Sequence, residues 1–377
     1  MPLSANHEIF LSLLRIGIGH QTSLDPKAAI DWKTIEALAK QQGLLAILLD
    51  GVEANTDLTN NTNTLLLTQK LTWIGEVVQG YEQRYQLYRK AIADLAAFYN
   101  AHGFRMMVLK GYACAVNWPK PEHRPCGDID IYLFGKYKEA DEVLEAWFKG
   151  LYVQGFKVDH SHHHHTVFSL NGFTVENHYD FVNVYAHKSS KKLEVVLKEL
   201  GQDDTHYIML NGQKVYIPSP NLHALFLIRH MVSHFSSTQL NLRQILDWGF
   251  FVEKQGKDVD WEWLLPLLEQ YHMKEFFNCI NVICVEDLGF DKVESLWSRV
   301  EGQLKSLEFR KLKERVLNDT LSPEFSKELP KVLIRRVPFK YRRWEANAWK
   351  RELCYAESER SSFWGGVWNH ILKPAGI

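Results

Sequence analysis

Apolar residues recur at helical spacing through the first hundred positions of the chain. The run from Ile9 to Ile18 predicts an amphipathic helix, and Asp31 is placed to cap a second one. Between residues 74 and 95, apolar and aromatic side chains three and four positions apart predict a longer third helix. We therefore expect an N-terminal helical region over residues 1–101.

From residue 105 onward, short apolar runs broken by Gly, Pro and Asn replace the helical period, which is typical of strands. One helix is predicted among them, at residues 137–148. Two Asn-Gly dipeptides, Asn171-Gly172 and Asn211-Gly212, separate alternating runs and predict hairpins, because both residues tolerate the positive φ of a type I′ turn. The predicted strands are Arg105–Leu109, Ile129–Phe134, His163–Leu170, Phe173–Tyr179, Tyr207–Leu210 and Gln213–Ile217.

After Pro220 the helical period returns and persists to the end of the chain. Three segments between residues 221 and 271 carry apolar residues three and four positions apart. We therefore expect an α+β fold with a small mixed β-sheet core at residues 102–220. The N-terminal helical region precedes this core, and a C-terminal helical domain at residues 221–377 follows it.

Composition narrows the class of protein. Hydrophobic residues make up 46% of the chain and charged residues 24%, which is typical of a folded globular protein. The net charge of −1 creates no global field toward nucleic acid or an anionic membrane. The five cysteines include no Cys-x-x-Cys pair, which argues against a disulfide framework and a zinc ribbon and favours a cytoplasmic location. No run reaches the roughly 18 apolar residues of a membrane span, so we expect no membrane partner.

The chemistry is concentrated around an Asp-Ile-Asp sequence. Side chains alternate across a strand, so Asp128 and Asp130 project from one face, roughly 7 Å apart, while Ile129 and Ile131 face the core. Two carboxylates on one face can share hard cations such as Mg²⁺, which leave coordination positions for phosphate oxygens. Two metal ions held in this way can stabilise an in-line displacement at phosphorus.

A third carboxylate comes from the first predicted hairpin. If Asn171-Gly172 forms a two-residue turn, Leu170 pairs with Phe173 and Val167 with Glu176, and the same register pairs His165 with His178 and His163 with Asp180. One face then carries the apolar side chains, and the other carries Glu176 and the histidines. This register places Glu176 so that it completes an acidic triad with Asp128 and Asp130.

These motifs together resemble a known family. An apolar strand ending in Lys110-Gly111, the segment Trp118-Pro119, Arg124 shortly before Asp-Ile-Asp and an acidic residue two positions before His178 are similar to the uncharacterised nucleotidyltransferases of the DNA-polymerase-β superfamily. The resemblance extends through a His-rich helix to the pair Leu246-Asp247. It implies a polymerase-β-like nucleotidyltransferase core between the two helical regions.

The resemblance also implies roles for individual residues. Asp128, Asp130 and Glu176 would hold Mg²⁺ or Mn²⁺ as catalytic and metal-binding residues, and Glu176 would help to deprotonate an attacking hydroxyl group. Lys110, Gly111, Arg124 and His178 would bind the nucleotide, an NTP such as ATP. The wider superfamily has Gly-Ser where this chain has Lys110-Gly111, which suggests that the lysine serves as a point charge for phosphate. Arg124 could instead pair with an acidic neighbour.

Two other segments leave alternatives open. In the run His162–His165, strand alternation would let only His163 and His165 serve one site, and a polar wall of the nucleotide cleft is favoured over a metal centre. His223, His230 and His234 on the following helix are expected in packing or supporting roles. The basic, aromatic segment 331–351 fits RNA or an acidic protein partner, or simply the end of an amphipathic helix.

The leading hypothesis is a nucleotidyltransferase that moves an NMP from an NTP to a hydroxyl acceptor with release of pyrophosphate. The acceptor could be a small molecule, an RNA end or a protein. A catalytically silent nucleotide-binding or regulatory protein with the same fold is the alternative, and the intact acidic set favours the enzyme. A metal phosphohydrolase would need His-Asp or His-x-His ligand clusters on helices, and the sequence contains no His-Asp pair.

Overall fold

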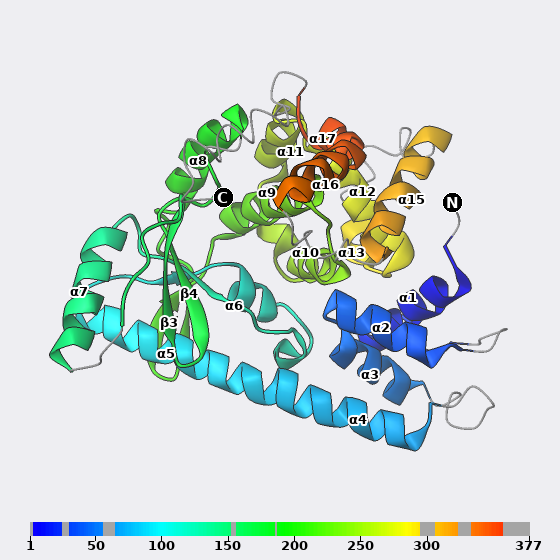
Figure 1. The fold of residues 1–377 in the computed structure, drawn as a ribbon, viewed down its shortest axis with the longest axis horizontal. Helices are drawn as coiled ribbons and strands as arrows, with labels where there is room; N and C mark the ends of the chain where they lie inside the picture. The colour runs from blue at the N-terminus through cyan, green and yellow to red at the C-terminus, as the bar shows by residue number, and fades with distance from the viewer. Residues whose placement is uncertain are drawn as a thin grey trace.

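The chain folds around a six-stranded mixed sheet with helices before, between and after the strands (Figure 1). This arrangement comes from a computed structural model that describes residues 3–24, 30–55, 65–151, 156–184, 187–294, 306–322 and 333–356. The predicted α+β class, a small mixed sheet flanked by helical regions, is confirmed.

The N-terminal helices end in a long helical rod that runs under the sheet (Figure 1). The predicted long helix is present, and a short π-helical segment divides it. Asp31 caps the second helix as predicted, because its side chain accepts a hydrogen bond from the Thr34 amide. The elements are α1 (Ala5–Gly17), α2 (Trp32–Gln42), α3 (Leu45–Ala54), α4 (Leu67–Val77), the π-helix η2 (Val78–Gln83) and α5 (Arg84–Ala101).

The strands pair in the order β3-β4-β2-β1-β6-β5, and both predicted Asn-Gly hairpins are present. Pairing of β2 with β4 and of β1 with β6 is parallel, and the other pairs are antiparallel. The elements are β1 (Met107–Val108), α6 (Lys110–Ala115), the 3₁₀ turn η3 (Pro121–His123), β2 (Ile129–Tyr132), α7 (Tyr137–Gly150), β3 (His165–Leu170), β4 (Phe173–His178), α8 (Lys188–Leu200), β5 (Tyr207–Leu210) and β6 (Gln213–Tyr216).

Helices follow the sheet in the rest of the described chain. No helix among the described residues has both the length and the apolar character that a bilayer span requires. The elements are α9 (Pro220–Ser237), α10 (Leu242–Gln255), the 3₁₀ turn η4 (Gly256–Asp258), α11 (Trp261–Gln270), α12 (Lys274–Val282), the π-helix η5 (Ile283–Asp287), α13 (Asp291–Glu294), α15 (Leu307–Leu321), α16 (Leu333–Ala346) and α17 (Ala348–Cys354).

Two buried apolar clusters hold these layers together. One joins α5 and α7 to one face of the sheet, with Tyr88 and Phe168 among its members. The other joins the N-terminal helices α1–α3 to α9, α10 and α12. Polar contacts also link the N-terminal helices to the helices that follow the sheet. Gln42 on α2 donates to the Thr320 carbonyl on α15 and accepts from the Leu242 amide on α10. The cavity described below lies where the sheet meets these helices.

Helices α1 and α3 cross in direct backbone contact at two glycines. A Cβ atom on Gly51 would lie 2.0 Å from the Leu13 carbonyl oxygen, and one on Gly17 would lie 2.2 Å from the Ile47 carbonyl oxygen. Real Cβ atoms do not approach backbone oxygens so closely, so the crossing requires glycine at both positions.

We predict that Gly51→Ala destabilises the protein by about 1–3 kcal/mol, because α1 and α3 must separate to admit the methyl group. Gly75→Ala on α4 is the matched control, since nothing lies within 4 Å of its Cβ position. That change should be neutral or stabilise by up to about 1 kcal/mol through helix propensity. Urea denaturation of both variants measures the difference. Equal effects of the two substitutions would contradict this packing.

Candidate active site

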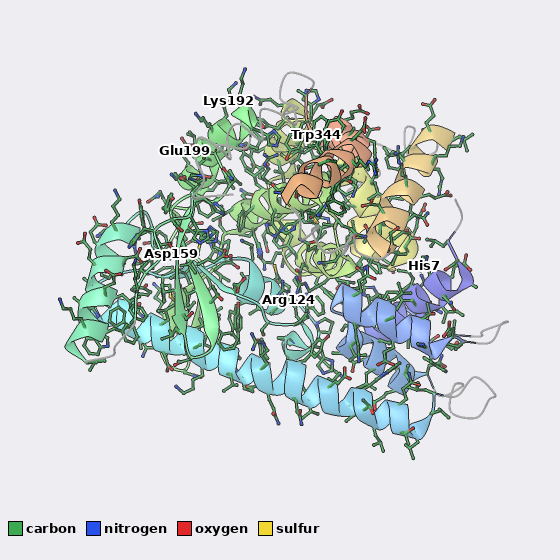
Figure 2. All side chains as sticks on the ribbon, viewed as in Figure 1. His7, Arg124, Asp159, Lys192, Glu199 and Trp344 are labelled. Atoms are coloured by element: carbon green, nitrogen blue, oxygen red, sulfur yellow. The ribbon has the colours of Figure 1, made fainter. Side chains whose placement is uncertain are left out.

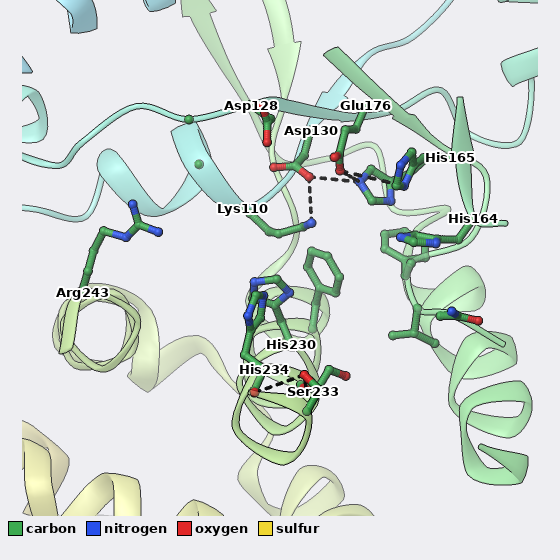
Figure 3. Close-up of a pocket in the computed structure, with 18 of the residues that line it drawn as sticks. Lys110, Asp128, Asp130, His164, His165, Glu176, His230, Ser233, His234 and Arg243 are labelled. Atoms are coloured by element: carbon green, nitrogen blue, oxygen red, sulfur yellow. Dashed lines mark hydrogen bonds and ion pairs between the residues drawn. The ribbon is translucent and has the colours of Figure 1, made fainter. Parts of the chain in front are cut away.

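A cavity of 530 Å³ lies between the sheet and helices α6, α9 and α10 (Figure 3). Its wall brings together carboxylates, cations and imidazoles. All seven residues that the sequence predicts for catalysis, metal binding or nucleotide binding line it, namely Lys110, Gly111, Arg124, Asp128, Asp130, Glu176 and His178. Residues that the sequence analysis did not assign to the site also line it, among them Asn183, Ser233 and Arg243.

Parallel pairing of β2 with β4 places Asp130 directly beside Glu176. The hairpin register behind this arrangement is the predicted one, because Leu170 pairs with Phe173 and Val167 with Glu176. Donor atoms of Asp130, Glu176 and His178 all lie within 4.8 Å of one another. Glu176 therefore lies beside Asp130, on the strand face that the hairpin register predicts for it.

Lys110 and His178 hold the buried carboxylate of Asp130. Lys110 Nζ lies 2.7 Å from Asp130 Oδ1, a contact that Figure 3 marks with a dashed line. His178 Nε2 lies 3.0 Å from the same oxygen. Burial opposes ionisation of Asp130, but Lys110 and His178 outweigh it and hold the pKa of this carboxyl well below its usual range. The same contacts raise the pKa of Lys110 and of His178 against the effect of burial. Asp130 is thus ionised and largely neutralised by its neighbours.

Glu176 shares His178 with Asp130. His178 Nε2 lies 3.4 Å from Glu176 Oε2, and His165 Nδ1 lies 3.9 Å from the same oxygen. Burial favours the neutral acid, yet the hydrogen bond with His178 lowers the pKa of Glu176 below its usual value. Glu176 is therefore ionised at neutral pH, which is the form that can bind a cation or accept a proton.

Asp128 precedes β2 and is the exposed member of the acidic set. The Tyr88 hydroxyl donates to its backbone carbonyl at 2.8 Å. Gly111 packs against the same contact, and a Cβ there would lie 2.5 Å from the Tyr88 oxygen. Burial and the nearby charges of Glu176 and Asp130 raise the pKa of the Asp128 carboxyl. Negative charge at this end of the site is therefore incompletely compensated.

The donor chemistry of this wall fits a divalent cation. Hard ions such as Mg²⁺ prefer carboxylate oxygens, and three carboxylates face the cavity. Burial and then the Glu176 and Asp130 charges raise the pKa of Asp128, so a cation among the three carboxylates would relieve part of their repulsion. Asp128, Asp130 and Glu176 are thus the residues that could hold a metal ion here.

Arg124 forms a buried ion pair inside the protein. Its Nε and Nη2 atoms donate to the two carboxylate oxygens of Asp247 at 2.7 and 2.9 Å, and Trp118 Nε1 donates to the first of these oxygens at 2.8 Å. Arg124 is only 7% exposed and Asp247 5%. Figure 2 labels the position of Arg124. Of the two alternatives that the sequence leaves open for Arg124, pairing with an acidic residue is the one formed.

The histidine run differs from the sequence expectation at one residue. His164 and His165 line the cavity, whereas His163 does not. The amides of Tyr179 and Asp180 both donate to the His164 carbonyl, which ends the alternating ladder, so the expected pairing of His163 with Asp180 is wrong. Strand alternation therefore does not extend to His164, and consecutive histidines can face one cavity.

Buried imidazoles form much of the remaining wall. Burial lowers the pKa of His164 to about 3 and of His165 to about 4, and their Nδ1 atoms have no hydrogen-bond partner among the described residues. His230 and His234, which the sequence suggests for supporting roles, line the cavity directly from α9. Burial, reinforced by Lys110, lowers the pKa of both. This wall is neutral and polar at physiological pH.

The basic, aromatic segment 331–351 lies partly outside the described residues. Within the described part, Lys350 is buried and lies 2.6 Å from Asp319 Oδ2. The guanidinium of Arg351 stacks 4.0 Å over the Trp344 ring and donates to that residue's carbonyl. These two cations contribute to the packing of α17, while Lys340 and Arg342 remain exposed on α16.

Comparison with known proteins identifies one family. The sequence profile of a family described as "Uncharacterised nucleotidyltransferase" matches residues 28–289, which include every candidate site residue. Among solved structures, an antigenic nucleotidyltransferase-like protein from Paracoccidioides brasiliensis is similar at 16% identity with a TM-score of 0.31, over 44% of this chain and 75% of that one. No curated protein matches the chain.

We predict that Asp247→Ala lowers the free energy of unfolding by about 3–5 kcal/mol, because it leaves the Arg124 guanidinium buried without its partner. The double variant Arg124→Leu, Asp247→Leu removes both charges and should be less destabilised than Asp247→Ala. Urea denaturation measures both. A double variant that is less stable than Asp247→Ala would show that Arg124 does not depend on this pair.

Proposed function

Because the chain belongs to the family of uncharacterised nucleotidyltransferases, we propose that it transfers an NMP from an NTP to a hydroxyl acceptor and releases pyrophosphate. The observation that carries this proposal is the pairing of Asp130 with Glu176 in adjacent parallel strands, beside Asp128 and inside one cavity. Separate segments of the chain contribute these carboxylates, and the register of the β3–β4 hairpin, which sets the face on which Glu176 lies, is strongly specified.

Asp128, Asp130 and Glu176 would bind Mg²⁺ or Mn²⁺. Such ions neutralise the charge that develops on the phosphate oxygens during an in-line displacement. Asp130 and Glu176 are suited to this role because they are ionised at neutral pH, as the lowered pKa of each indicates. Lys110 and His178 keep both carboxylates charged while the cavity is free of nucleotide.

In the reaction, an oxygen of the acceptor hydroxyl forms a bond to the α-phosphorus of the NTP. The bond from that phosphorus to the bridging oxygen of the β-phosphate breaks, and pyrophosphate leaves with the bonding electrons. Glu176 would accept the proton of the hydroxyl group, a role supported by its ionised carboxylate and its place on the cavity wall. The neutral histidine wall offers hydrogen-bonding groups to a base or an acceptor without adding charge.

A catalytically silent nucleotide-binding protein is the second candidate function. The contacts of Lys110 and His178 with Asp130 favour it, because they neutralise one of the three carboxylates. A regulatory protein could keep this ion cluster as a structural element of the fold. The two functions differ in one observable, which is transfer of nucleotide label to an acceptor.

ATP is one candidate donor, and the acceptor could be a small molecule, an RNA end or a protein. We keep RNA or an acidic protein as proposed partners for the exposed cations of α16, Lys340 and Arg342. Labelled acceptors from fractionated lysate would distinguish these classes by their sensitivity to nuclease and to protease.

The test is incubation of the purified protein with each α-labelled NTP, Mg²⁺ or Mn²⁺ and fractionated lysate. We predict labelled product that depends on the divalent ion. Asp128→Asn and Glu176→Gln should each lower the transfer rate about a hundredfold or more, because an amide is a poor ligand for a hard cation. Asp128→Asn should also leave the melting temperature unchanged or raise it, since it relieves repulsion at an exposed position.

Asp258→Asn, on the exposed turn η4 away from the cavity, is the matched control and should keep wild-type transfer. Transfer by Asp128→Asn at the wild-type rate would refute the assignment of the acidic set. Nucleotide binding without transfer to any fraction would favour the silent protein.

A further inference from the structure

Three cationic side chains other than histidine line the cavity within the described chain, and two of them have partners in the protein. Lys110 pairs with Asp130, and Arg124 pairs with Asp247. Arg243 has no hydrogen bond or ion pair with any described residue, and its Nε atom is buried without a partner. Figure 3 shows its guanidinium extending from α10 toward α6 at the edge of the cavity.

The structure explains why Arg243 lacks an internal partner. Asp247 lies one helical turn further along α10, at the spacing where an Arg and an Asp normally pair. Both oxygens of Asp247 are already occupied, because Arg124 takes the pair of them and Trp118 donates to one. The ion pair between Arg124 and Asp247 therefore leaves Arg243 without the acidic partner that helical spacing would give it.

The position of Arg243 on its helix is also unfavourable for a cation. A capping box formed by Asn241 and Gln244 fixes the start of α10, so Arg243 lies in the first turn, where the helix dipole is positive. No acidic residue lies in that turn. Burial and the neighbouring charge of Arg124 lower the pKa of Arg243. A half-buried guanidinium kept in such surroundings costs stability unless an anion binds to it.

We propose that Arg243 binds a phosphate group of the polyphosphate of the nucleotide. The planar guanidinium presents donors that match phosphate oxygens in a bidentate arrangement. This inference rests on the proposed function, which brings an NTP into the cavity. It shifts phosphate recognition from Arg124, which the fold uses internally, to a residue on the helical side of the cleft.

The experiment measures binding of ATP, inorganic tripolyphosphate and adenosine by calorimetry, with Mg²⁺ present, to the wild type and to Arg243→Gln. We expect the variant to bind ATP and tripolyphosphate about tenfold to a hundredfold more weakly and to bind adenosine as the wild type does. Arg243→Lys should recover part of the loss. Arg310→Gln on the exposed surface of α15 removes the same charge far from the cavity and should change nothing.

A thermal melt without ligand separates binding from a structural role. Arg243→Gln should melt at the wild-type temperature or above it, because it removes an unpaired, half-buried charge. A much lower melting temperature, or unchanged affinity for ATP and tripolyphosphate, would overturn the proposal. Unchanged affinity for ATP and tripolyphosphate would also be expected if Arg243 bound an anionic acceptor instead.

Failure of this proposal can be told apart from failure of the proposed function. If the wild type transfers label and Arg243→Gln binds ATP normally, the phosphate site is wrong and nucleotidyl transfer stands. If no acceptor is labelled but Arg243→Gln still weakens ATP and tripolyphosphate, the phosphate site stands and transfer fails.

Discussion

The buried ionised carboxylate of Asp130 is the constraint on which the rest of the site depends. Removing this charge from water is costly, and the fold offsets the cost with Lys110 from α6 and His178 from β4. Lys110 follows β1 closely. These contacts form only when β1 pairs in register with β2 and β2 pairs in register with β4. The order of the central strands and the chemistry of the cavity are therefore two aspects of one arrangement.

A second buried ion pair links the sheet region to the helices. Arg124 precedes β2, whereas Asp247 lies in α10, more than a hundred residues later in the chain. Their bidentate contact holds α10 against the segment that carries Asp128. It also uses the acidic partner that Arg243 would otherwise take. One structural contact thus leaves a cation available to a ligand in the same cavity.

The sequence predicts the features that depend on local pattern. The Asn171-Gly172 turn and the alternation of apolar residues are sufficient to place Glu176 on the face of His178, and the register agrees. They do not reveal that two amides share the His164 carbonyl, because this depends on how the chain leaves β4. The alternation of residues therefore predicts which face of the sheet a side chain occupies only as far as the pairing of β3 with β4 continues.

Contacts between distant segments could not be predicted in the same way. The choice of Asp247 as the partner of Arg124, and the isolation of Arg243 that results, depend on how α10 packs against the loop before β2. An arginine four residues before an aspartate on a helix normally predicts an ion pair between them. Only the tertiary structure shows that a different arginine takes the aspartate.

A crystal structure of the protein with Mn²⁺ and a non-hydrolysable NTP analogue, with the metal located by its anomalous scattering, would test the acidic set most directly. We expect Mn²⁺ bound by carboxylate oxygens of Asp128, Asp130 and Glu176 and in contact with the analogue's phosphates. Mn²⁺ bound instead by His164, His165 and His178, whose donor atoms also lie within 4.8 Å of one another, would contradict this expectation.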